Sequence, residues 1–155
     1  MVPAARAGMS QGTRSRFFAG PCSCRLDAES IFATCQRFAV DALETLGPAH
    51  SEKTYEDVLC NKLYAARIPV RRQASVCQTV DDHVVCTGIV DLEVDHCLIL
   101  ELKAGHSSIT QEHRAQLQRY MRSMHASPRT DANLIGAIFL FSKHGVLHTW
   151  RTPGA

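Results

Sequence analysis

The sequence predicts an α/β (α+β) fold in which helices flank a central sheet, with elements in the order ααβββαββ. Apolar residues recur at three- and four-residue steps between positions 28 and 66, as on the buried face of a helix. After Pro69 the pattern changes to the alternation expected for strands. Residues 134–141 form an apolar run that suits a central strand covered on both faces. A chain of 155 residues is long enough for one such domain, which we place at 28–155.

The first two helices have recognisable boundaries. Asp27 can cap the first helix and Gly47-Pro48 ends it, while Ser51 is placed to cap the second. The apolar stripe of the first helix consists of Ile31, Phe32, Cys35, Phe38, Ala39, Ala42, Leu43 and Leu46. The predicted buried face of the second consists of Tyr55, Val58, Leu59, Leu63 and Ala66.

The remaining elements are predicted from the same patterns. Asp81-Asp82 is expected to be a turn, and residues 143–145 another. A third helix should run from Ser107 to about Met124, with Ile109, Leu117, Tyr120, Met121 and Met124 on its apolar side. The predicted strands are 70–80, 83–95, 97–104, 134–141 and 146–150.

Charge is distributed unevenly along the chain. Residues 1–27 hold four arginines against Asp27, which leaves 13 basic and 14 acidic residues in 28–155, a net charge of −1. Phosphate contacts must therefore come from a local patch, from the N-terminal segment or from a bound metal. Because residues 1–27 are acid-poor and contain Arg and Ser, we expect a disordered tail or, alternatively, an organelle-targeting segment. No apolar run approaches the roughly 20 residues that cross a bilayer, so no membrane role is expected.

The cysteine pattern indicates a reducing compartment. Seven cysteines occur without a C-x-x-C pair, and an odd count argues against a disulfide framework and a structural zinc site. Four of them lie in apolar-patterned segments and are expected to be buried free thiols, namely Cys60, Cys77, Cys86 and Cys97. We expect an intracellular, cytoplasmic protein, or a mitochondrial or other organellar one if the N-terminal segment is a targeting signal.

A β-hairpin centred on His96 brings three charged residues together. In this register one face of the hairpin is entirely apolar, and a slip by one residue would set acids against leucines. The other face then carries Asp91 opposite Glu101, with Lys103 two residues further along the second strand. The apolar pairs are Val94–Leu98, Leu92–Leu100 and Val90–Leu102, and Ile89 falls opposite Lys103.

Two carboxylates in direct opposition predict a divalent-cation site. Their repulsion costs up to about 1 kcal/mol in a sheet unless a charge neutralises it. Carboxylate and carbonyl oxygens suit Mg²⁺ or Mn²⁺, and Lys103 could orient a water or offset charge on a phosphate. The alternative is an exposed sheet face with solvated acids, because Glu93 would lie on the same face.

Two helical pairs are further candidates. Glu52 and Glu56 lie one above the other near the start of the second helix and could supply another metal or water ligand. Acids at a helix N-terminus are also favoured by the helix dipole alone. Gln116 and Tyr120 are likewise four residues apart in the third helix, where a packing Tyr beside a solvated Gln is the simpler interpretation.

Together these motifs resemble the PD-(D/E)XK nuclease superfamily. The resemblance rests on Asp91, Glu101-Leu102-Lys103 and Gln116-Leu-Gln-Arg-Tyr120, the last as in the RecB-like branch with its Q-x-x-x-Y motif. Residues 46–56, Leu-Gly-Pro-Ala-His-Ser-Glu-Lys-Thr-Tyr-Glu, resemble the signature of the small GxxExxY proteins. The likeness covers roughly residues 30–150. The chain departs from it at Ala49, where the signature has Gly, and at Val90, where the superfamily name has Pro.

The resemblance implies a restriction-endonuclease-like fold, a mixed sheet flanked by helices, with the site at the hairpin. By analogy, Asp91, Glu101 and the backbone carbonyl of Leu102 would bind Mg²⁺ (or Mn²⁺), and Lys103 would position the attacking water. One of the acids of the second helix, Glu52 or Glu56, would assist at the metal site from the helix. The Q-x-x-x-Y pair, Gln116 and Tyr120, would contact the nucleic-acid backbone or support the site.

The function expected from these features is a metal-dependent nuclease acting on DNA, less so on RNA. The main alternative is a catalytically silent protein that keeps the fold as a structural, assembly or nucleic-acid-binding component of a larger complex. A protein partner or a homo-oligomer is compatible with either. Aromatic content is 6%, so a single-strand stacking platform is not evident.

Overall fold

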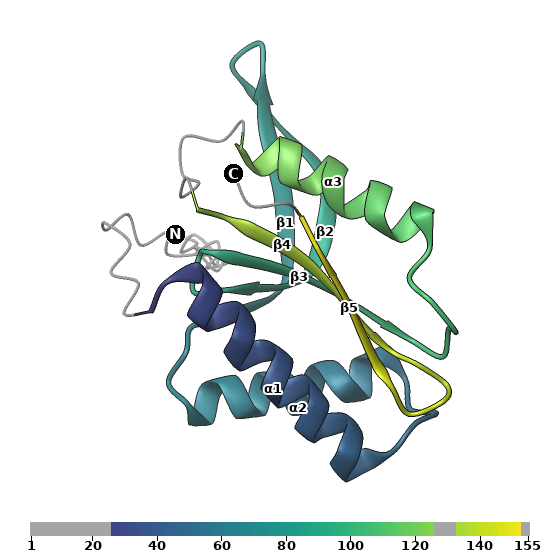
Figure 1. Ribbon diagram of the computed structural model, residues 1–155. Coiled ribbons are helices and arrows are strands. Elements are labelled where there is room, and N and C mark those ends of the chain that lie inside the picture. Colours follow the sequence, from purple (N-terminus) through teal and green to yellow (C-terminus); the bar gives the residue numbers. More distant parts are fainter. Residues whose placement is uncertain (1–25, 126–132, 153–155) are drawn as a thin grey trace, which may run out of the picture.

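The computed structural model describes residues 26–125 and 133–152, and it confirms the order ααβββαββ (Figure 1). Most of the N-terminal segment 1–27, for which a tail or a targeting segment is expected, lies outside the described residues. The elements are α1 (Ala28–Leu46), α2 (Glu52–Ala65), β1 (Val70–Val80), β2 (His83–Val94), β3 (Leu98–Ala104), α3 (Gln111–His125), β4 (Ile135–Phe141) and β5 (Leu147–Arg151).

A five-stranded sheet in the order β1-β2-β3-β4-β5 forms the centre of the fold. Strands β3 and β4 are parallel, and the other neighbours are antiparallel. The larger core cluster lies between the sheet and α1 and α2, and a smaller one lies between the sheet and α3 on the other face (Figure 1). This mixed sheet between helices confirms the fold class that the resemblance implies.

The caps of α1 and α2 are those expected from the sequence. The Asp27 carboxylate accepts a hydrogen bond from the Ser30 backbone N–H at 2.8 Å, and the Ser51 hydroxyl accepts one from Thr54 N at 3.2 Å. The predicted buried face of α2 is partly wrong. Ala66 is exposed and Val58 is only half-buried, whereas Glu56 and Cys60 are buried.

The predicted start of α3 is wrong by four residues, because Thr110 caps this helix. Its hydroxyl accepts a hydrogen bond from His113 N at 3.2 Å, and its backbone carbonyl accepts one from Arg114 N at 3.3 Å. The other boundaries agree with the prediction or move by one residue. The β2–β3 turn is wider than expected because Asp95 and His96 adopt positive φ angles of 46° and 58°, which are uncommon for residues other than glycine.

The predicted hairpin register holds only near the turn. Leu92 pairs with Leu100 and Val94 with Leu98, as expected. The expected pairs Val90–Leu102, Asp91–Glu101 and Ile89–Lys103 are wrong, because the recorded β2–β3 pairing ends at Leu92–Leu100. At this point the Asp91 carboxylate, instead of a β2 carbonyl, accepts the hydrogen bond of the Leu102 backbone N–H at 2.7 Å.

A bend in β1 accompanies this separation of the strands. Gln73 has a positive φ of 48° and is missing from the β1–β2 pairing, in which Arg72 faces Leu92 and Ala74 faces Val90. Leu92 belongs to the core under α1 and α2, but Val90 belongs to the core under α3. The expected single apolar face of the hairpin is therefore divided between the two sides of the sheet.

Two of the expected buried thiols are not buried. Cys60 and Cys97 lie in the core as predicted, but Cys77 is half-buried and Cys86 is exposed. Both lie on the part of the β1–β2 ribbon that extends beyond the rest of the sheet (Figure 1). Among the described residues, no helix is long and apolar enough to cross a membrane.

Candidate active site

Asp91 lies where β2 separates from β3, and its half-buried carboxylate accepts hydrogen bonds from two groups. Its Oδ2 accepts the Leu102 N–H at 2.7 Å, and its Oδ1 accepts a hydrogen bond from Gln73 Nε2 at 3.4 Å. The backbone bond ties the Asp91 carboxylate to β3, the strand that also carries Glu101 and Lys103. The predicted convergence of these three residues is therefore achieved by a side-chain bond rather than by strand pairing.

Glu101 is the most buried acid of this group. Its exposed fraction is 4%, its Oε1 is buried without a hydrogen-bond partner, and its Oε2 lies 3.6 Å from Lys103 Nζ. Burial, followed by the nearby charge of Asp91, raises the pKa of Glu101 to about 7, against the opposing effect of Lys103. The Oε1 side of the Glu101 carboxylate therefore has no hydrogen-bond donor among the described residues, whereas Lys103 lies near the Oε2 side.

The acids of α2 approach the same place from the facing helix. Glu52 Oε1 accepts a hydrogen bond from the Ala104 backbone N–H at 3.3 Å, at the end of β3. Glu56 is buried and accepts bonds from Arg72 Nε at 2.6 Å and Gln73 Nε2 at 3.3 Å. Gln73 thus links Glu56 to Asp91, and Arg72 neutralises Glu56.

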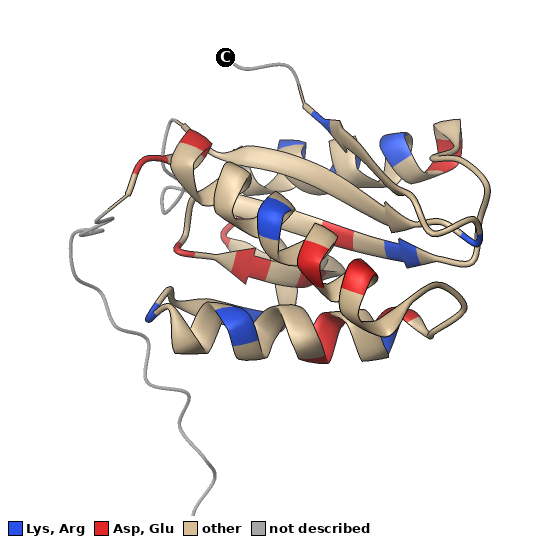
Figure 2. Ribbon diagram, turned by 60° about the horizontal axis from the view of Figure 1, so that its bottom comes forward, with Lys and Arg blue, Asp and Glu red and all other residues tan. Residues whose placement is uncertain are grey.

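A cavity of about 610 Å³ opens over these groups. Its walls come from the start of α2, the bend of β1 and the separation point of β2, so the three predicted acids Glu52, Glu56 and Asp91 share it. The lining residues are Ser51, Glu52, Lys53, Glu56, Arg72, Gln73 and Asp91. Acidic and basic residues are interspersed on α1 and α2 (Figure 2). The surface of these two helices is therefore of mixed charge and is not uniformly basic.

Arg72 and Gln73 are parts of the site that the sequence patterns did not identify. Their signal was present, because Arg71-Arg72-Gln73 interrupts the alternation of β1 with three consecutive polar residues. His113 on α3 is a third such residue. Its ring lies edge-on to His106 at 5.3 Å, and burial, followed by the charges of Lys103 and His106, lowers its pKa.

The residues present fit a hard divalent cation. In the part of the chain that the structure describes, no three His, Cys, Asp or Glu side chains converge closely enough to hold a metal by themselves. Mg²⁺, however, keeps several waters and is commonly bound through one or two carboxylates. Asp91 and Glu101 supply two, and the buried Glu101 Oε1 has an unused acceptor position.

Gln116 and Tyr120 hydrogen-bond to each other. Gln116 Nε2 donates a hydrogen bond to the Tyr120 hydroxyl at 3.0 Å, so the pair acts as one unit. The Tyr120 ring covers Gly88 so closely that a Cβ there would lie 2.2 Å from its Cε1. Across the described ranges, neither side chain hydrogen-bonds to Asp91, Glu101 or Lys103, so the structure does not bring the pair into the acidic cluster.

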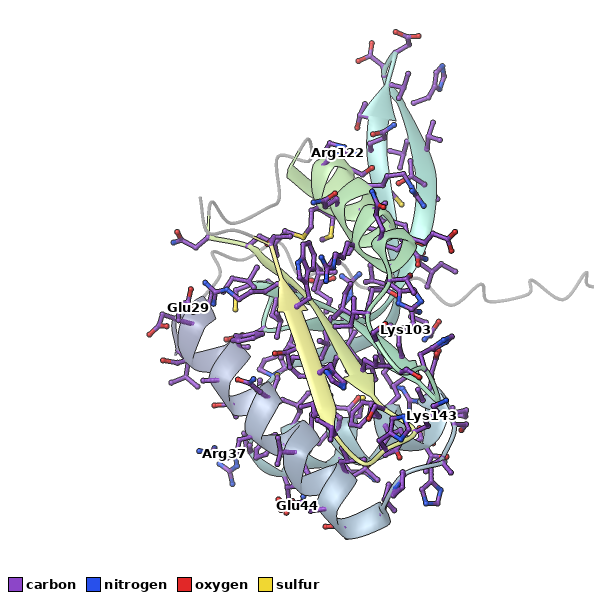
Figure 3. The ribbon with its side chains drawn as sticks, turned by 45° about the vertical axis from the view of Figure 1, so that its right-hand side comes forward. Glu29, Arg37, Glu44, Lys103, Arg122 and Lys143 are labelled. Carbon is purple, nitrogen blue, oxygen red and sulfur yellow. The ribbon has the colours of Figure 1, made fainter. Side chains whose placement is uncertain are left out.

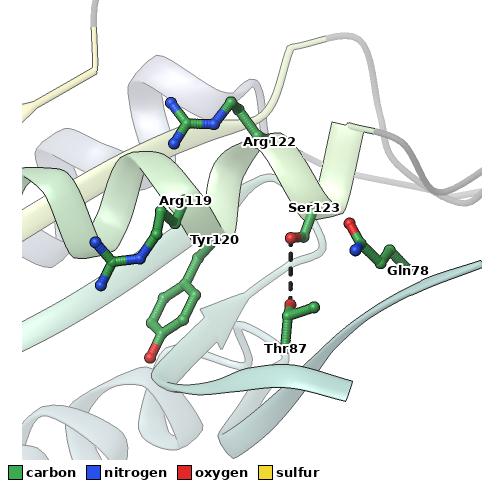
Figure 4. Close-up of a pocket in the computed structure, with 6 residues that line it drawn as sticks. All are labelled: Gln78, Thr87, Arg119, Tyr120, Arg122 and Ser123. Atoms are coloured by element: carbon green, nitrogen blue, oxygen red, sulfur yellow. Dashed lines mark hydrogen bonds between the residues drawn. The ribbon is translucent and has the colours of Figure 1, made fainter. Parts of the chain in front are cut away.

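Tyr120 instead lines a second cavity, of about 310 Å³, between α3 and the β1–β2 ribbon (Figure 4). Arg119 and Arg122 are exposed at its rim, and neither has an ion-pair partner among residues 26–125 and 133–152. Thr87 Oγ1 donates to Ser123 Oγ at 3.2 Å across the cavity, and Gln78 completes the lining. The two cavities share no lining residue, so they are separate places. Figure 3 shows Lys103, which lines neither cavity, well apart from Arg122 of the second one.

A comparison with known protein families gives a match over most of this fold. A family model for the PD-(D/E)XK nuclease superfamily matches residues 29–135. The chain belongs to the PD-(D/E)XK nuclease superfamily. The matched span begins in α1 and ends at the first residue of β4, so it contains every predicted site residue. No curated protein and no solved structure matches the chain.

Membership of the PD-(D/E)XK superfamily supports a nuclease-like function and nucleic acid as the general class of substrate. It also agrees with the chemistry of the site, because this superfamily usually uses divalent metals. The predicted acids and lysine, Asp91, Glu101 and Lys103, stand on β2 and β3, which the Asp91–Leu102 hydrogen bond joins beyond their last paired residues.

Proposed function

We propose that this protein is a metal-dependent nuclease that hydrolyses phosphodiester bonds in DNA. Asp91, Glu101 and the backbone carbonyl of Leu102 are the proposed ligands of Mg²⁺ (or Mn²⁺). The observation that carries the proposal is the state of Glu101. A carboxylate that is 4% exposed, with one oxygen unpartnered and a second acid beside it, is unfavourable unless a cation joins it.

The protein's own groups have distinct roles in this proposal. When bound, the metal would lower the pKa of a water and stabilise negative charge on the phosphate. Lys103 holds the attacking water and offsets charge on the phosphate, and its contact with Glu101 fixes the position of its ammonium group. Glu52 orients the end of β3 through Ala104 N. Glu56, neutralised by Arg72, holds Gln73 against Asp91 and so positions that carboxylate.

The finer assignment to the GxxExxY proteins of the RecB-like branch is supported by the backbone before α2. Ala49 has a φ of 71° and stands where the signature has Gly. This left-handed conformation is one that favours glycine. The signature Glu is Glu52, at the mouth of the site. The signature Tyr is Tyr55, which stacks on Phe141 at 4.0 Å and donates to the Gly47 carbonyl at 2.6 Å.

Wild-type protein tests the activity directly. Single-stranded DNA, double-stranded DNA and RNA of one sequence should be incubated with Mg²⁺, with Mn²⁺ and with a chelator, and the products separated by length. We expect cleavage of DNA that requires the metal and stops with the chelator. Inactivity on all three substrates, together with no Mn²⁺ binding by calorimetry, would contradict the proposal.

The proposed path of the DNA runs from the acids to the cavity under α3. Tyr120 lines this second cavity and accepts a hydrogen bond from Gln116. Both would contact the DNA backbone, with Arg119 and Arg122 supplying positive charge for phosphates. Replacing Arg119 and Arg122 together by Ala should weaken DNA binding about tenfold at low salt. The slope of log affinity against log salt should fall by roughly one to two, one for each lost phosphate contact.

Fluorescence anisotropy of labelled DNA, without added Mg²⁺ or Mn²⁺, measures both quantities. The matched control is Arg37→Ala on α1, whose guanidinium lies over the Phe38 ring on the opposite side of the sheet. That variant should bind as the wild type does. Equal losses in both variants would indicate a general charge effect and contradict the assignment of the α3 cavity.

A catalytically silent assembly component is the second candidate, favoured by exposed apolar side chains on the β1–β2 ribbon. A protein partner or a second copy of the chain could cover them. They are Val80, Val84, Val85 and Ile89, with exposed fractions of 45%, 74%, 44% and 55%. Under this alternative the activity assay is negative, and the protein elutes from size-exclusion chromatography as an oligomer or binds a partner through the ribbon.

A further inference from the structure

Cys77 and Cys86 face each other across the β1–β2 ribbon. They are directly opposed in the antiparallel register, and their Sγ atoms are 2.7 Å apart. A disulfide bond is about 2.05 Å long, so the two sulfurs need to approach each other by less than about 1 Å. The pair arises because the register shifts between Val76 and Cys77, which sets Cys77 against Cys86.

The backbone already has the geometry that a disulfide requires. Directly opposed residues of an antiparallel pair have Cα atoms about 4.5 or 5.5 Å apart, depending on which kind of pair they form. Disulfides occur at Cα separations of roughly 4.4–6.8 Å, so either kind of pair is compatible with a bond. Oxidation therefore needs no rearrangement of the two strands.

Accessibility distinguishes this pair from the other described thiols. Cys86 is exposed and Cys77 is half-buried, whereas Cys35, Cys60 and Cys97 are buried. Burial raises the pKa of Cys35 to about 12 and that of Cys60 to about 11, so both stay as unreactive thiols. The sulfur contact with Cys86 raises the pKa of Cys77. Cys86 is the exposed member of the pair, so it is the sulfur that meets an oxidant first.

We propose that Cys77 and Cys86 are a reversible redox-modification site, oxidised by a hydroperoxide to a cross-strand disulfide. The Cys86 thiolate attacks the O–O bond of hydrogen peroxide, which gives a sulfenic acid and releases hydroxide. The Cys77 sulfur then attacks the Cys86 sulfur and expels the second oxygen as water. Two thiols and one peroxide give one disulfide and two waters, and a dithiol reductant reverses the change.

The disulfide would fix one wall of the α3 cavity. The Thr87 hydroxyl, next to Cys86, is within hydrogen-bond distance of Val76 O at 3.3 Å and of Ser123 Oγ at 3.2 Å. The following residue, Gly88, is covered by the Tyr120 ring. Oxidation at Cys86 therefore stiffens the strand segment on which Tyr120 packs. This proposal does not depend on nuclease activity, because it concerns only the two thiols and the strands that carry them.

Mass spectrometry of the full chain tests the bond. Folded protein is treated with hydrogen peroxide, blocked with an alkylating agent and digested with trypsin together with a protease that cleaves before Asp. This separates residues 73–80, which contain Cys77, from residues 82–90, which contain Cys86. We expect the two fragments to remain linked until dithiothreitol is added, while Cys35, Cys60 and Cys97 stay unmodified. The oxidised protein should also melt roughly 5 °C higher than the reduced protein.

A matched variant checks that the register is responsible. In the double variant Cys86→Ser with Val85→Cys, the number of thiols is unchanged, but the new thiol lies opposite Gln78 on the other face of the ribbon. The linked fragment should disappear. If wild-type Cys77 and Cys86 are oxidised or alkylated separately, with no linked fragment, the proposal is overturned. Equal linkage in the double variant would overturn it as well.

Discussion

Replacing Glu101 by Gln is expected to reduce metal-dependent DNA cleavage by on the order of 10³-fold. The amide has nearly the same shape as the carboxylate, so the fold is retained, but the charge that would hold the cation is lost. Lys103→Ala should cause a loss of similar size, because Lys103 Nζ, which lies 3.6 Å from Glu101 Oε2, is the positive group proposed to position the water. The rate of cleavage of a labelled DNA at saturating Mn²⁺ measures both effects.

The matched control is Glu93→Gln, which removes another buried acid, from the neighbouring strand. Glu93 is 9% exposed and is paired with Arg71 and His96 beside the hairpin turn. This variant should cleave DNA within a few-fold of the wild-type rate. Wild-type activity in Glu101→Gln would contradict the proposed metal ligands, even if the protein proved to be a nuclease.

The metal-free protein is expected to lose stability through Glu101 as the pH rises, by on the order of 3 kcal/mol. Burial raises the folded-state pKa of Glu101 from 4.5 to about 7, so the folded state favours the protonated acid. The stabilising contribution is therefore fully present below the unfolded-state pKa. It is lost as the pH rises through about 7, where the folded protein must carry a buried charge.

Urea unfolding at pH values below 4.5 and above 7 measures this contribution when wild type is compared with Glu101→Gln. The comparison is needed because hydrogen bonds lower the pKa of Asp27, Glu29 and Asp57, which gives the opposite pH dependence in both proteins. Above pH 7 the Gln variant should be the more stable one. Mg²⁺ or Mn²⁺ should stabilise only the wild type, by about 2.7 kcal/mol at a hundredfold excess over Kd. A pH-independent difference between the two proteins would show that Glu101 ionises normally.

The fold was predictable where local signals agreed. Asp27 and Ser51 cap the helices that they were expected to cap, and β1 has the predicted bounds of Val70–Val80. The start of α3 was placed four residues too early because the Thr110 cap was not recognised in a polar segment. The burial of Glu56 could not be predicted from the helical pattern, because its partner Arg72 lies 16 residues away on a strand.

The sequence predicted which residues belong to the candidate site better than it predicted how they are arranged. Asp91, Glu101 and Lys103 are brought together as expected, with Glu52 and Glu56 at the same cavity as Asp91. Their roles in binding metal and in catalysis remain proposals. Gln116 and Tyr120 were recognisable as a helical pair, but only the packing of α3 on Gly88 sets them beside a different cavity.

The sequence by itself determined which residues meet at the hairpin, because alternating leucines leave one register near the His96 turn that buries them. Only the tertiary structure decided how they meet. The Asp91 side chain takes a strand hydrogen bond, Gln73 bends β1, and the hairpin then contributes to two cores instead of one. These features depend on contacts between distant segments, and local periodicity carries no information about such contacts.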